Sequence, residues 1–267
     1  MGVLKELEDI RHIIDTCDKE LTAIFERRLE AVLEILAYKR EKALPVLQPE
    51  REQEVLNKVH TYLKYPEFSL ELESLFRQIL KISRRLQSKR LFPYNIVLIG
   101  FMGSGKSTVG KEISKPLEMD YVDTDHWIIE KTGMSINEIF RTQGEAGFRK
   151  LEVEAIKSLQ DKNNTIISCG GGVVLTPENV EALKKNGRLI WLKATPQEIY
   201  RRISGDTSRP LLKDTLSVEK IEEMLTKRAP LYENAKDIIV DTQEKTISEI
   251  SMEIIEGLLK NMIYAHR

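Results

Sequence analysis

The sequence lacks a long apolar run: the longest, at residues 96–102, falls well short of the ~18 residues that a membrane-spanning helix needs. Cysteine is scarce, and Cys17 and Cys169 lie too far apart, in unrelated patterns, to indicate a disulfide framework. The chain turns charged at Lys5, so we expect no signal peptide. These absences favour a soluble protein of the cytoplasm.

Positive and negative charges are almost balanced along the chain. The chain has 41 basic and 42 acidic residues, a net charge of −1, and neither half is basic enough to indicate nucleic acid as the main partner. Charged residues nevertheless make up 31% of the chain, which favours long solvated helices. A hydrophobic content of 41% is sufficient to bury real cores.

Glycine is nearly absent from residues 1–91, where Gly2 is the only one. Three prolines divide this region, and we predict helices over about residues 3–43, 49–64 and 67–90. The first would be ~60 Å long and carries apolar residues at heptad spacing. Two shorter helices cannot cover it, so a second chain or a sharp fold must cover the remainder. The apolar repeat consists of Leu4, Leu7, Ile14, Leu21, Phe25, Val32 and Ile35.

Charged residues interrupt this repeat at Arg11, Asp18, Arg28 and Lys39. One interpretation is a coiled coil whose polar core positions set its register. Another is a site for an anionic ligand, because burying a cation costs free energy unless an anion lies beside it. Arg28 and Lys39 would lie ~16 Å apart, close enough to hold one small ligand, whereas Arg11 would lie ~25 Å from Arg28. A two-fold dimer would bring the partner's Arg11 to that ligand.

The pattern changes at residues 91–94, where we place a boundary between domains 1–91 and 92–267. Beyond it, segments typical of buried strands alternate with segments of helix length. This alternation predicts an α/β domain with a parallel sheet. The expected strands are residues 95–100, 121–122, 165–168, 189–192 and 238–240.

Residues 100–107 read GFMGSGKS and fit the phosphate-binding pattern GxxxxGK[ST]. The glycines allow backbone N–H groups to surround phosphate oxygens, and the helix that follows adds its dipole. Lys106 would reach the β- and γ-phosphates of a nucleotide, and the Ser107 hydroxyl would ligate Mg²⁺. A chance glycine turn is the alternative, but the position between a strand and a helix argues against it.

Polar residues also follow the later strands. Asp123 and Asp125 end the second strand, at the edge where open α/β sheets bind ligands. Asp123 is placed to support Mg²⁺, and Asp125, pointing the same way along the strand, to face an acceptor hydroxyl, although an aspartate here can also cap a helix. Glycines 170–172 allow close approach of a ligand, and residues 205–216 have the composition of a closing lid. Three arginines without an obvious local carboxylate partner add cations: Arg149, Arg209 and Arg228.

Residues 94–262 resemble shikimate kinase. The resemblance rests on GSGKST at 103–108, DTD at 123–125, FR at 148–149, GGG at 170–172, RPLL at 209–212 and RAPLY at 228–232. It implies a sheet order of 2-3-1-4-5, ATP with Mg²⁺, and shikimate as the acceptor. Adenylate kinase and gluconate kinase are the nearest alternatives, but two arginines facing three glycines suit a small carboxylate better than a nucleobase.

The same resemblance implies roles for single residues. Asp125 would meet the reacting 3-hydroxyl, Arg149 and Arg228 would hold the carboxylate, and Gly171 and Gly172 would lie beside the ring. Arg209 would close over the transferring phosphoryl group, and Ser107 and Asp123 would serve the metal. The residues implied for ATP are Gly103, Ser104, Gly105, Lys106, Ser107, Thr108, Arg202, Arg209 and Lys245.

Residues 4–90 resemble the all-helical class of chorismate mutase, through Arg11, Arg28, Lys39, Arg51, Glu52, Ser83 and Gln87. The resemblance implies an intertwined homodimer of three-helix chains, with Arg11 donated across it. Arginines would bind the two carboxylates of chorismate and Glu52 its hydroxyl. Lys39 and Gln87 would donate to the ether oxygen during a Claisen rearrangement, which needs only fixed donors. Gln48 departs from the family, which often has an acidic residue there.

Together the two resemblances predict a bifunctional enzyme of the shikimate pathway. Two alternatives remain for the helical region. It could sense chorismate or prephenate without catalysis, or it could serve only to dimerise the kinase. Lys39 with Gln87 favours catalysis, because a sensor has little need of donors to an ether oxygen.

Overall fold

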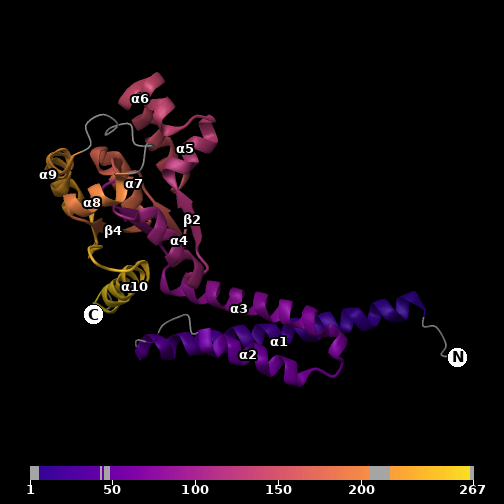
Figure 1. The fold of residues 1–267 in the computed structure, drawn as a ribbon. Coiled ribbons are helices and arrows are strands. Elements are labelled where there is room, and N and C mark those ends of the chain that lie inside the picture. Colours follow the sequence, from indigo (N-terminus) through magenta and orange to yellow (C-terminus); the bar gives the residue numbers. More distant parts are fainter. Residues whose placement is uncertain (1–5, 43, 45–48, 205–216, 265–267) are drawn as a thin grey trace. The chain divides into compact units, whose positions relative to one another are not determined.

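The computed structural model of the chain describes residues 6–42, 44, 49–204 and 217–264. The chain divides into two compact units, Met1–Gln87 and Ser88–Arg267 (Figure 1). We call them the helical unit and the sheet unit and describe each by itself. None of the helices within the described ranges combines the length and the apolarity that crossing a membrane requires.

Three long helices form the helical unit, as the sequence predicts. Helix α1 spans Leu7–Glu41, α2 spans Pro49–Tyr62 and α3 spans Ser69–Leu91, the last preceded by a short 3-10 turn at Pro66–Phe68. Pro49 opens α2 because proline fits the first helical position, where its missing N–H costs nothing.

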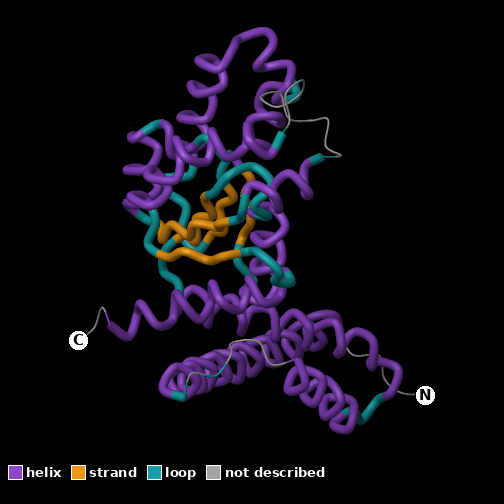
Figure 2. The backbone as a smooth tube through the Cα atoms, turned by 60° about the vertical axis from the view of Figure 1, so that its left-hand side comes forward, coloured by secondary structure: helices purple, strands orange, loops and turns teal. Residues whose placement is uncertain are grey.

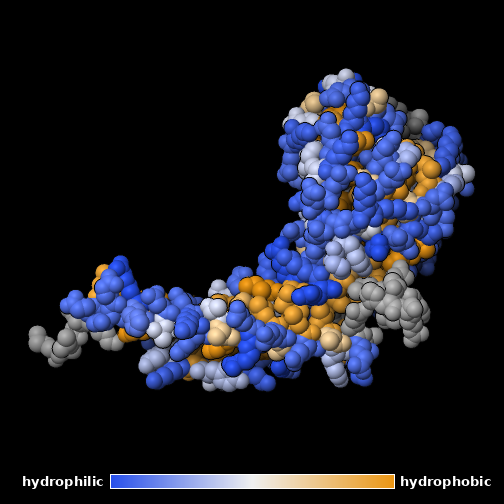
Figure 3. Space-filling view, turned by 180° about the vertical axis from the view of Figure 1, so that it is seen from behind, coloured by the Kyte–Doolittle hydropathy of each residue, from blue (hydrophilic) through white to orange (hydrophobic). Residues whose placement is uncertain are grey.

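Most described members of the α1 repeat are not buried within a single chain. Val32 is 7% exposed and Leu36 is 8% exposed, together with buried residues of α2 and α3, whereas Leu7, Ile14 and Leu21 are each at least half exposed. Figure 3 shows apolar side chains at the surface of the helical unit. Helix α1 is one 35-residue helix, so the sharp fold considered from the sequence does not occur within it. A single chain therefore leaves part of the repeat uncovered.

The sheet unit has five parallel strands in the order β2-β3-β1-β4-β5, which confirms the predicted topology. Figure 2 shows the strands enclosed by helices. The strands are β1 at Asn95–Ile99, β2 at Asp120–Asp123, β3 at Thr165–Ser168, β4 at Gly187–Lys193 and β5 at Ile238–Asp241. The helices are α4 at Lys106–Leu117, α5 at Thr124–Thr132, α6 at Ile136–Ser158, α7 at Pro177–Lys185, α8 at Pro196–Ile203, α9 at Val218–Ala235 and α10 at Ile247–Tyr264.

Helices cover the sheet on both faces. Helix α4 packs on β1, β2 and β3, and α10 packs on α4 and β5, while α7 and α9 pack on β4. Every residue of β1 is buried, as expected for a central parallel strand covered on both sides. Strand β1 pairs with β3 on one side and β4 on the other, so the turn that follows it lies where an open α/β sheet binds ligands.

Candidate active sites

The phosphate-binding turn joins β1 to α4, the context that the sequence predicts. Gly103 and Gly105 have φ angles of 74° and 95°, a region that residues with a side chain rarely adopt. Lys106 opens α4 and is 8% exposed, and its Nζ donates to the carbonyls of Gly100 and Phe101, each at 2.9 Å. The lysine side chain thus folds back over its own loop and contacts two of the loop's carbonyl groups.

Asp123 links this turn to the next strand. Its Oδ2 accepts from the Ser107 hydroxyl at 2.7 Å, and its Oδ1 caps α5 by accepting from the backbone N–H groups of Asp125 and His126. Asp123 is therefore the helix cap that the sequence left open, and it also holds the Ser107 hydroxyl. The Tyr121 hydroxyl also donates to Oδ2 at 3.2 Å, and burial followed by the Asp123 charge raises the pKa of Tyr121 to about 12.

The prediction that Asp125 continues the strand is wrong. Helix α5 begins at Thr124, so Asp125 lies in the first turn of a helix. The reason is the side chain of Asp123, which satisfies two backbone N–H groups of that turn and starts the helix there. Asp125 nevertheless reaches the same cavity as the phosphate-binding turn.

A cavity of about 640 Å³ joins the turn to the rest of the predicted kinase site. Ser104 is not among the residues that line it, since its side chain is 1% exposed. Apolar side chains, among them Ile136 and Phe140, cover part of its wall. The predicted residues that line it are Gly103, Gly105, Lys106, Ser107, Thr108, Asp123, Asp125, Arg149, Gly171, Gly172, Arg202 and Arg228.

Arg149 has carboxylate partners that the sequence interpretation missed. Its Nη1 donates to Glu152 Oε2 at 2.9 Å and its Nη2 to Glu145 Oε1 at 3.0 Å. The expectation of no local partner is therefore wrong for this arginine, although spacings of three and four residues on a helix could have revealed both. Burial lowers the pKa of Arg149, but the two carboxylates outweigh it and leave that pKa raised. A Cβ at Gly172 would lie 2.3 Å from the guanidinium, so a larger residue there would have to displace the end of the arginine side chain.

Glu152 is fully buried beside Arg149. Burial raises its pKa to about 7, Arg149 opposes the shift, and the Asp125 charge adds to it. Its Oε1 is buried without a hydrogen-bond partner. A carboxyl group in this setting is close to its titration point near neutral pH.

Arg228 reaches the cavity from the opposite side, on α9. It is 8% exposed, its Nη1 donates to the Gly171 carbonyl at 3.3 Å, and its guanidinium lies over the Phe101 ring. The Tyr232 hydroxyl donates to the same carbonyl at 2.5 Å. Two partly buried guanidinium groups thus face glycines 170–172 from α6 and α9, an arrangement suited to a small anion.

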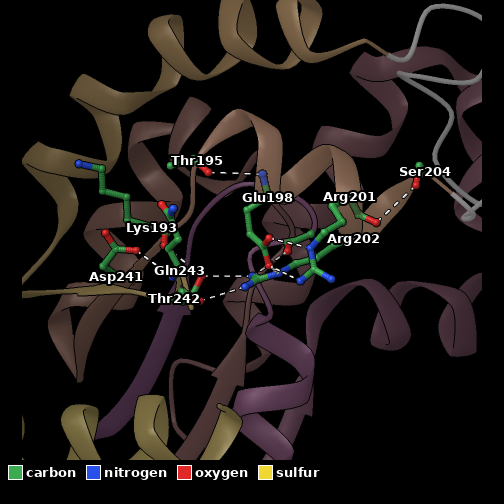
Figure 4. A network of polar contacts seen from close by, with 10 residues as sticks. Lys193, Thr195, Glu198, Arg201, Arg202, Ser204, Asp241, Thr242 and Gln243 are labelled. Carbon is green, nitrogen blue, oxygen red and sulfur yellow. Dashed lines mark hydrogen bonds and ion pairs between the residues drawn. The ribbon is translucent and has the colours of Figure 1, made fainter. Parts of the chain in front are cut away.

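Arg202 ties the phosphate-binding turn to the loop after β5 (Figure 4). It donates to the Gly103 carbonyl at 3.3 Å and to Thr242, while Glu198 holds its Nε at 2.7 Å. Lys245 instead pairs with Glu253 and does not line the cavity. Arg209 and the predicted lid at 205–216 lie outside the described residues.

A second group of polar side chains gathers inside the helical unit. Arg28 donates to the Ser83 hydroxyl at 2.7 Å, and Lys39 is 8% exposed. Burial lowers the pKa of Lys39, and the Glu52 charge acts in the opposite direction, which places these two groups near each other. Gln87 is 7% exposed, with its Oε1 buried and without a hydrogen-bond partner. We call this group, with Arg84, the helical cluster: Arg28, Lys39, Glu52, Ser83, Arg84 and Gln87.

Two predicted residues do not join the helical cluster within one chain. Arg11 is exposed and pairs with Glu8, one helical turn away. Arg51 is exposed and pairs with Glu54. Gln48, the noted departure from the family, lies outside the described residues.

Comparison with known proteins identifies both parts of the chain. Residues 102–259 match the family described as shikimate kinase, and residues 10–88 match the family described as chorismate mutase type II. A shikimate kinase of Thermodesulfovibrio yellowstonii is 48% identical over 162 residues, which cover 61% of this chain and 93% of that protein. One from Caldanaerobacter subterraneus is 45% identical over 166 residues, which cover 62% of this chain and 96% of that protein.

Solved structures agree with the sequence comparison. The shikimate kinase of Acinetobacter baumannii in complex with shikimate superposes with a TM-score of 0.63 at 32% identity, covering 65% of this chain and 98% of that one. The shikimate kinase of Aquifex aeolicus superposes with a TM-score of 0.56 at 38% identity, covering 63% of this chain and 98% of that one.

Proposed function

Because the chain belongs to the shikimate kinase family and also carries a chorismate mutase type II domain, we propose that it performs the two reactions at two separate sites. The sheet unit transfers the γ-phosphoryl group of ATP to the 3-hydroxyl of shikimate. The helical unit converts chorismate to prephenate. The observation that carries the proposal is one chain with two distinct groups of buried cations, one along the sheet-unit cavity and one in the helical cluster.

The phosphoryl donor binds at the turn between β1 and α4. Backbone N–H groups of that turn and the Lys106 ammonium hold the phosphates. The Nζ of Lys106, which donates to the carbonyls of Gly100 and Phe101, would turn to the phosphate oxygens. Arg209 closes over the γ-phosphoryl group, and Arg202 packs beside the nucleotide.

The residues present fit a magnesium ion. Ser107 Oγ and Asp123 Oδ2 lie 2.7 Å apart on the cavity wall, and hydroxyl and carboxylate oxygens are the donors that Mg²⁺ prefers. When bound, the ion would neutralise charge on the phosphate oxygens. Ser107 would supply one ligand, and Asp123 would orient the ion's surroundings.

The acceptor lies on the other side of the cavity. Arg149 and Arg228 hold the shikimate carboxylate, and the Gly171 backbone supports the ring. Asp125 accepts the proton of the 3-hydroxyl as its oxygen bonds to the γ-phosphorus and the bond to the bridging oxygen of ADP breaks. The support for a carboxylate acceptor is the pair of guanidinium groups facing glycines 170–172.

The mutase reaction takes place in the helical cluster of a homodimer. Arg28 and the partner's Arg11 hold the two carboxylates of chorismate, and Glu52 accepts a hydrogen bond from its hydroxyl. Lys39 and Gln87 donate to the ether oxygen as its bond to carbon breaks, so negative charge develops beside fixed donors. Both are buried, which favours catalysis over sensing because desolvated donors act most strongly on developing charge.

The homodimer is supported by the uncovered part of the α1 repeat. Leu7, Ile14, Leu21 and Ile35 are each at least half exposed in a single chain. A second copy of α1 would cover them and bring Arg11 to the other chain's cluster. We place the enzyme in the cytoplasm, in keeping with its two unpaired cysteines.

Two assays on the purified full-length chain test the proposal. The first measures ADP formation that depends on shikimate, and the second measures the loss of chorismate by absorbance. Turnover in both assays is the expected result. Chorismate binding without turnover would assign the helical unit to sensing, and no binding at all would leave it as a dimerisation domain.

A further inference from the structure

Arg84 is a charged residue on the inward face of α3. It lies three positions before Gln87, and Ser83 lies four before Gln87, so each of the two side chains neighbours Gln87 on the helix surface. Ser83 and Gln87 are buried there, and the Arg84 side chain is 18% exposed. None of the roles assigned above to the helical cluster uses this arginine.

The partner of Arg84 is the carboxylate predicted to bind the ligand's hydroxyl. A single guanidinium nitrogen, Nη1, donates to both Glu52 Oε1 and Glu52 Oε2 at 2.6 Å. The two residues come from different helices, α2 and α3, and are 32 positions apart in sequence. A carboxylate has about four acceptor positions, so Glu52 keeps the capacity to accept one more hydrogen bond while Arg84 holds it.

Glu52 also lies within the electrostatic reach of Lys39, whose pKa it raises against the effect of burial. One carboxylate therefore lies between two cations with different tasks. If Lys39 were its only cationic partner, attraction to Glu52 would compete with donation from the ammonium to the ligand's ether oxygen. A second cation on the carboxylate reduces that competition.

We propose that Arg84 is a positioning residue of the mutase site, which holds Glu52 toward the ligand hydroxyl and leaves Lys39 to serve the ether oxygen. The inference rests on the proposed mutase function. Arg84 acts through Glu52 and does not itself contact the reacting atoms. Its removal should therefore lower kcat as well as raise KM, since both the orientation of the ligand and the position of Lys39 are disturbed.

The test measures mutase kinetics of the full chain with Arg84→Met, Arg84→Lys and Glu52→Gln, and with the double variant Arg84→Met/Glu52→Gln. Arg85→Met is the matched control, because Arg85 is an exposed arginine next to Arg84 on the same helix. Thermal unfolding followed by circular dichroism accompanies each variant. We expect Arg84→Met to lower kcat/KM at least ~10-fold, the loss of one charge-assisted hydrogen bond. Arg84→Lys should restore part of it, and Arg85→Met should change it less than twofold.

The double variant is the decisive measurement. If Arg84 works through Glu52, adding Arg84→Met to Glu52→Gln costs no further activity. A further ~10-fold loss in that background would mean that Arg84 acts on the ligand directly and would overturn the inference. A fall in melting temperature with unchanged kinetics would do the same, since it would make the ion pair purely structural. If Arg84→Met does not fold, Arg84→Lys is compared with the unaltered chain, and the double variant is compared with Glu52→Gln. If the unaltered chain does not turn over chorismate, the mutase function itself is refuted. If the unaltered chain is active and Arg84→Met leaves that activity unchanged, only the role of Arg84 is refuted.

Discussion

Replacing Glu152 by glutamine should remove a large part of the pH dependence of stability in the sheet unit. Glu152 is fully buried, and its pKa lies at about 7 instead of 4.5, because burial penalises its charged form more than Arg149 stabilises it. Between these two pKa values the folded chain holds a proton that the unfolded chain has lost. Raising the pH through this window therefore lowers the free energy of unfolding.

The size of the effect follows from the shift. A change from 4.5 to about 7 corresponds to about 3 kcal/mol, at roughly 1.4 kcal/mol for each pKa unit. Most of this contribution of Glu152 to the free energy of unfolding is lost as the pH rises from about 5 to about 8. Glutamine does not titrate, so the Glu152→Gln chain should lose about 2 to 3 kcal/mol less stability over the same interval than the unaltered chain.

Urea unfolding followed by tryptophan fluorescence is the appropriate assay. The two tryptophans of the chain, Trp127 and Trp191, both belong to the sheet unit, so their emission reports on that unit in the full-length protein. Unfolding curves at about pH 5 and pH 8 give the free energies for each variant.

Glu145→Gln is the control for this measurement. It removes the other carboxylate on Arg149, but Glu145 is 53% exposed, so the pH dependence of the unaltered chain should persist. Equal pH dependence in the Glu152→Gln chain and the unaltered chain would refute the reasoning. It would mean that Glu152 is ionised in the folded state at both pH values.

The remaining predictions concern the two sites. Arg149→Ala should raise KM for shikimate ~10- to 100-fold, the loss of a charge-assisted contact, with KM for ATP nearly unchanged; normal shikimate kinetics would exclude that role. Ser107→Ala should raise the Mg²⁺ concentration for half-maximal kinase rate at least ~10-fold, and an unchanged titration would remove this hydroxyl from the metal site. Co-expressing Arg11→Ala chains with Lys39→Met chains should return up to about half of the mutase activity per mixed dimer, because one of its two sites has both residues. Lasting inactivity of a verified mixed dimer would show that Arg11 does not act across the dimer.

The fold was largely predictable because its signals are local. Prolines and the lack of glycine mark the helices of the first 91 residues, and short buried segments mark the parallel strands. The sheet order came from the resemblance to shikimate kinase and is confirmed. The start of α5 at Thr124 was missed because it depends on which way one carboxylate turns, and Asp123 serves both the helix and Ser107.

Most of the residues predicted for the kinase site line one cavity, but the partners of their side chains are less predictable. Helical spacing allows Arg149 to pair with Glu145 and Glu152, but it does not say that Glu152 is buried with a raised pKa. The pairing of Arg84 with Glu52 joins two helices across 32 positions, so no local pattern contains it. Such pairs depend on packing, which the sequence specifies only through the complete fold.

Independence of the two sites is the central claim, and one set of measurements tests it most directly. Both activities are assayed in Lys106→Ala and Lys39→Met chains, where methionine fills the volume of the buried Lys39 side chain. We predict that Lys106→Ala loses shikimate-dependent ADP formation at least ~100-fold and keeps chorismate turnover within about twofold, with the reverse result for Lys39→Met. Loss of both activities from either substitution in a folded chain would contradict the claim.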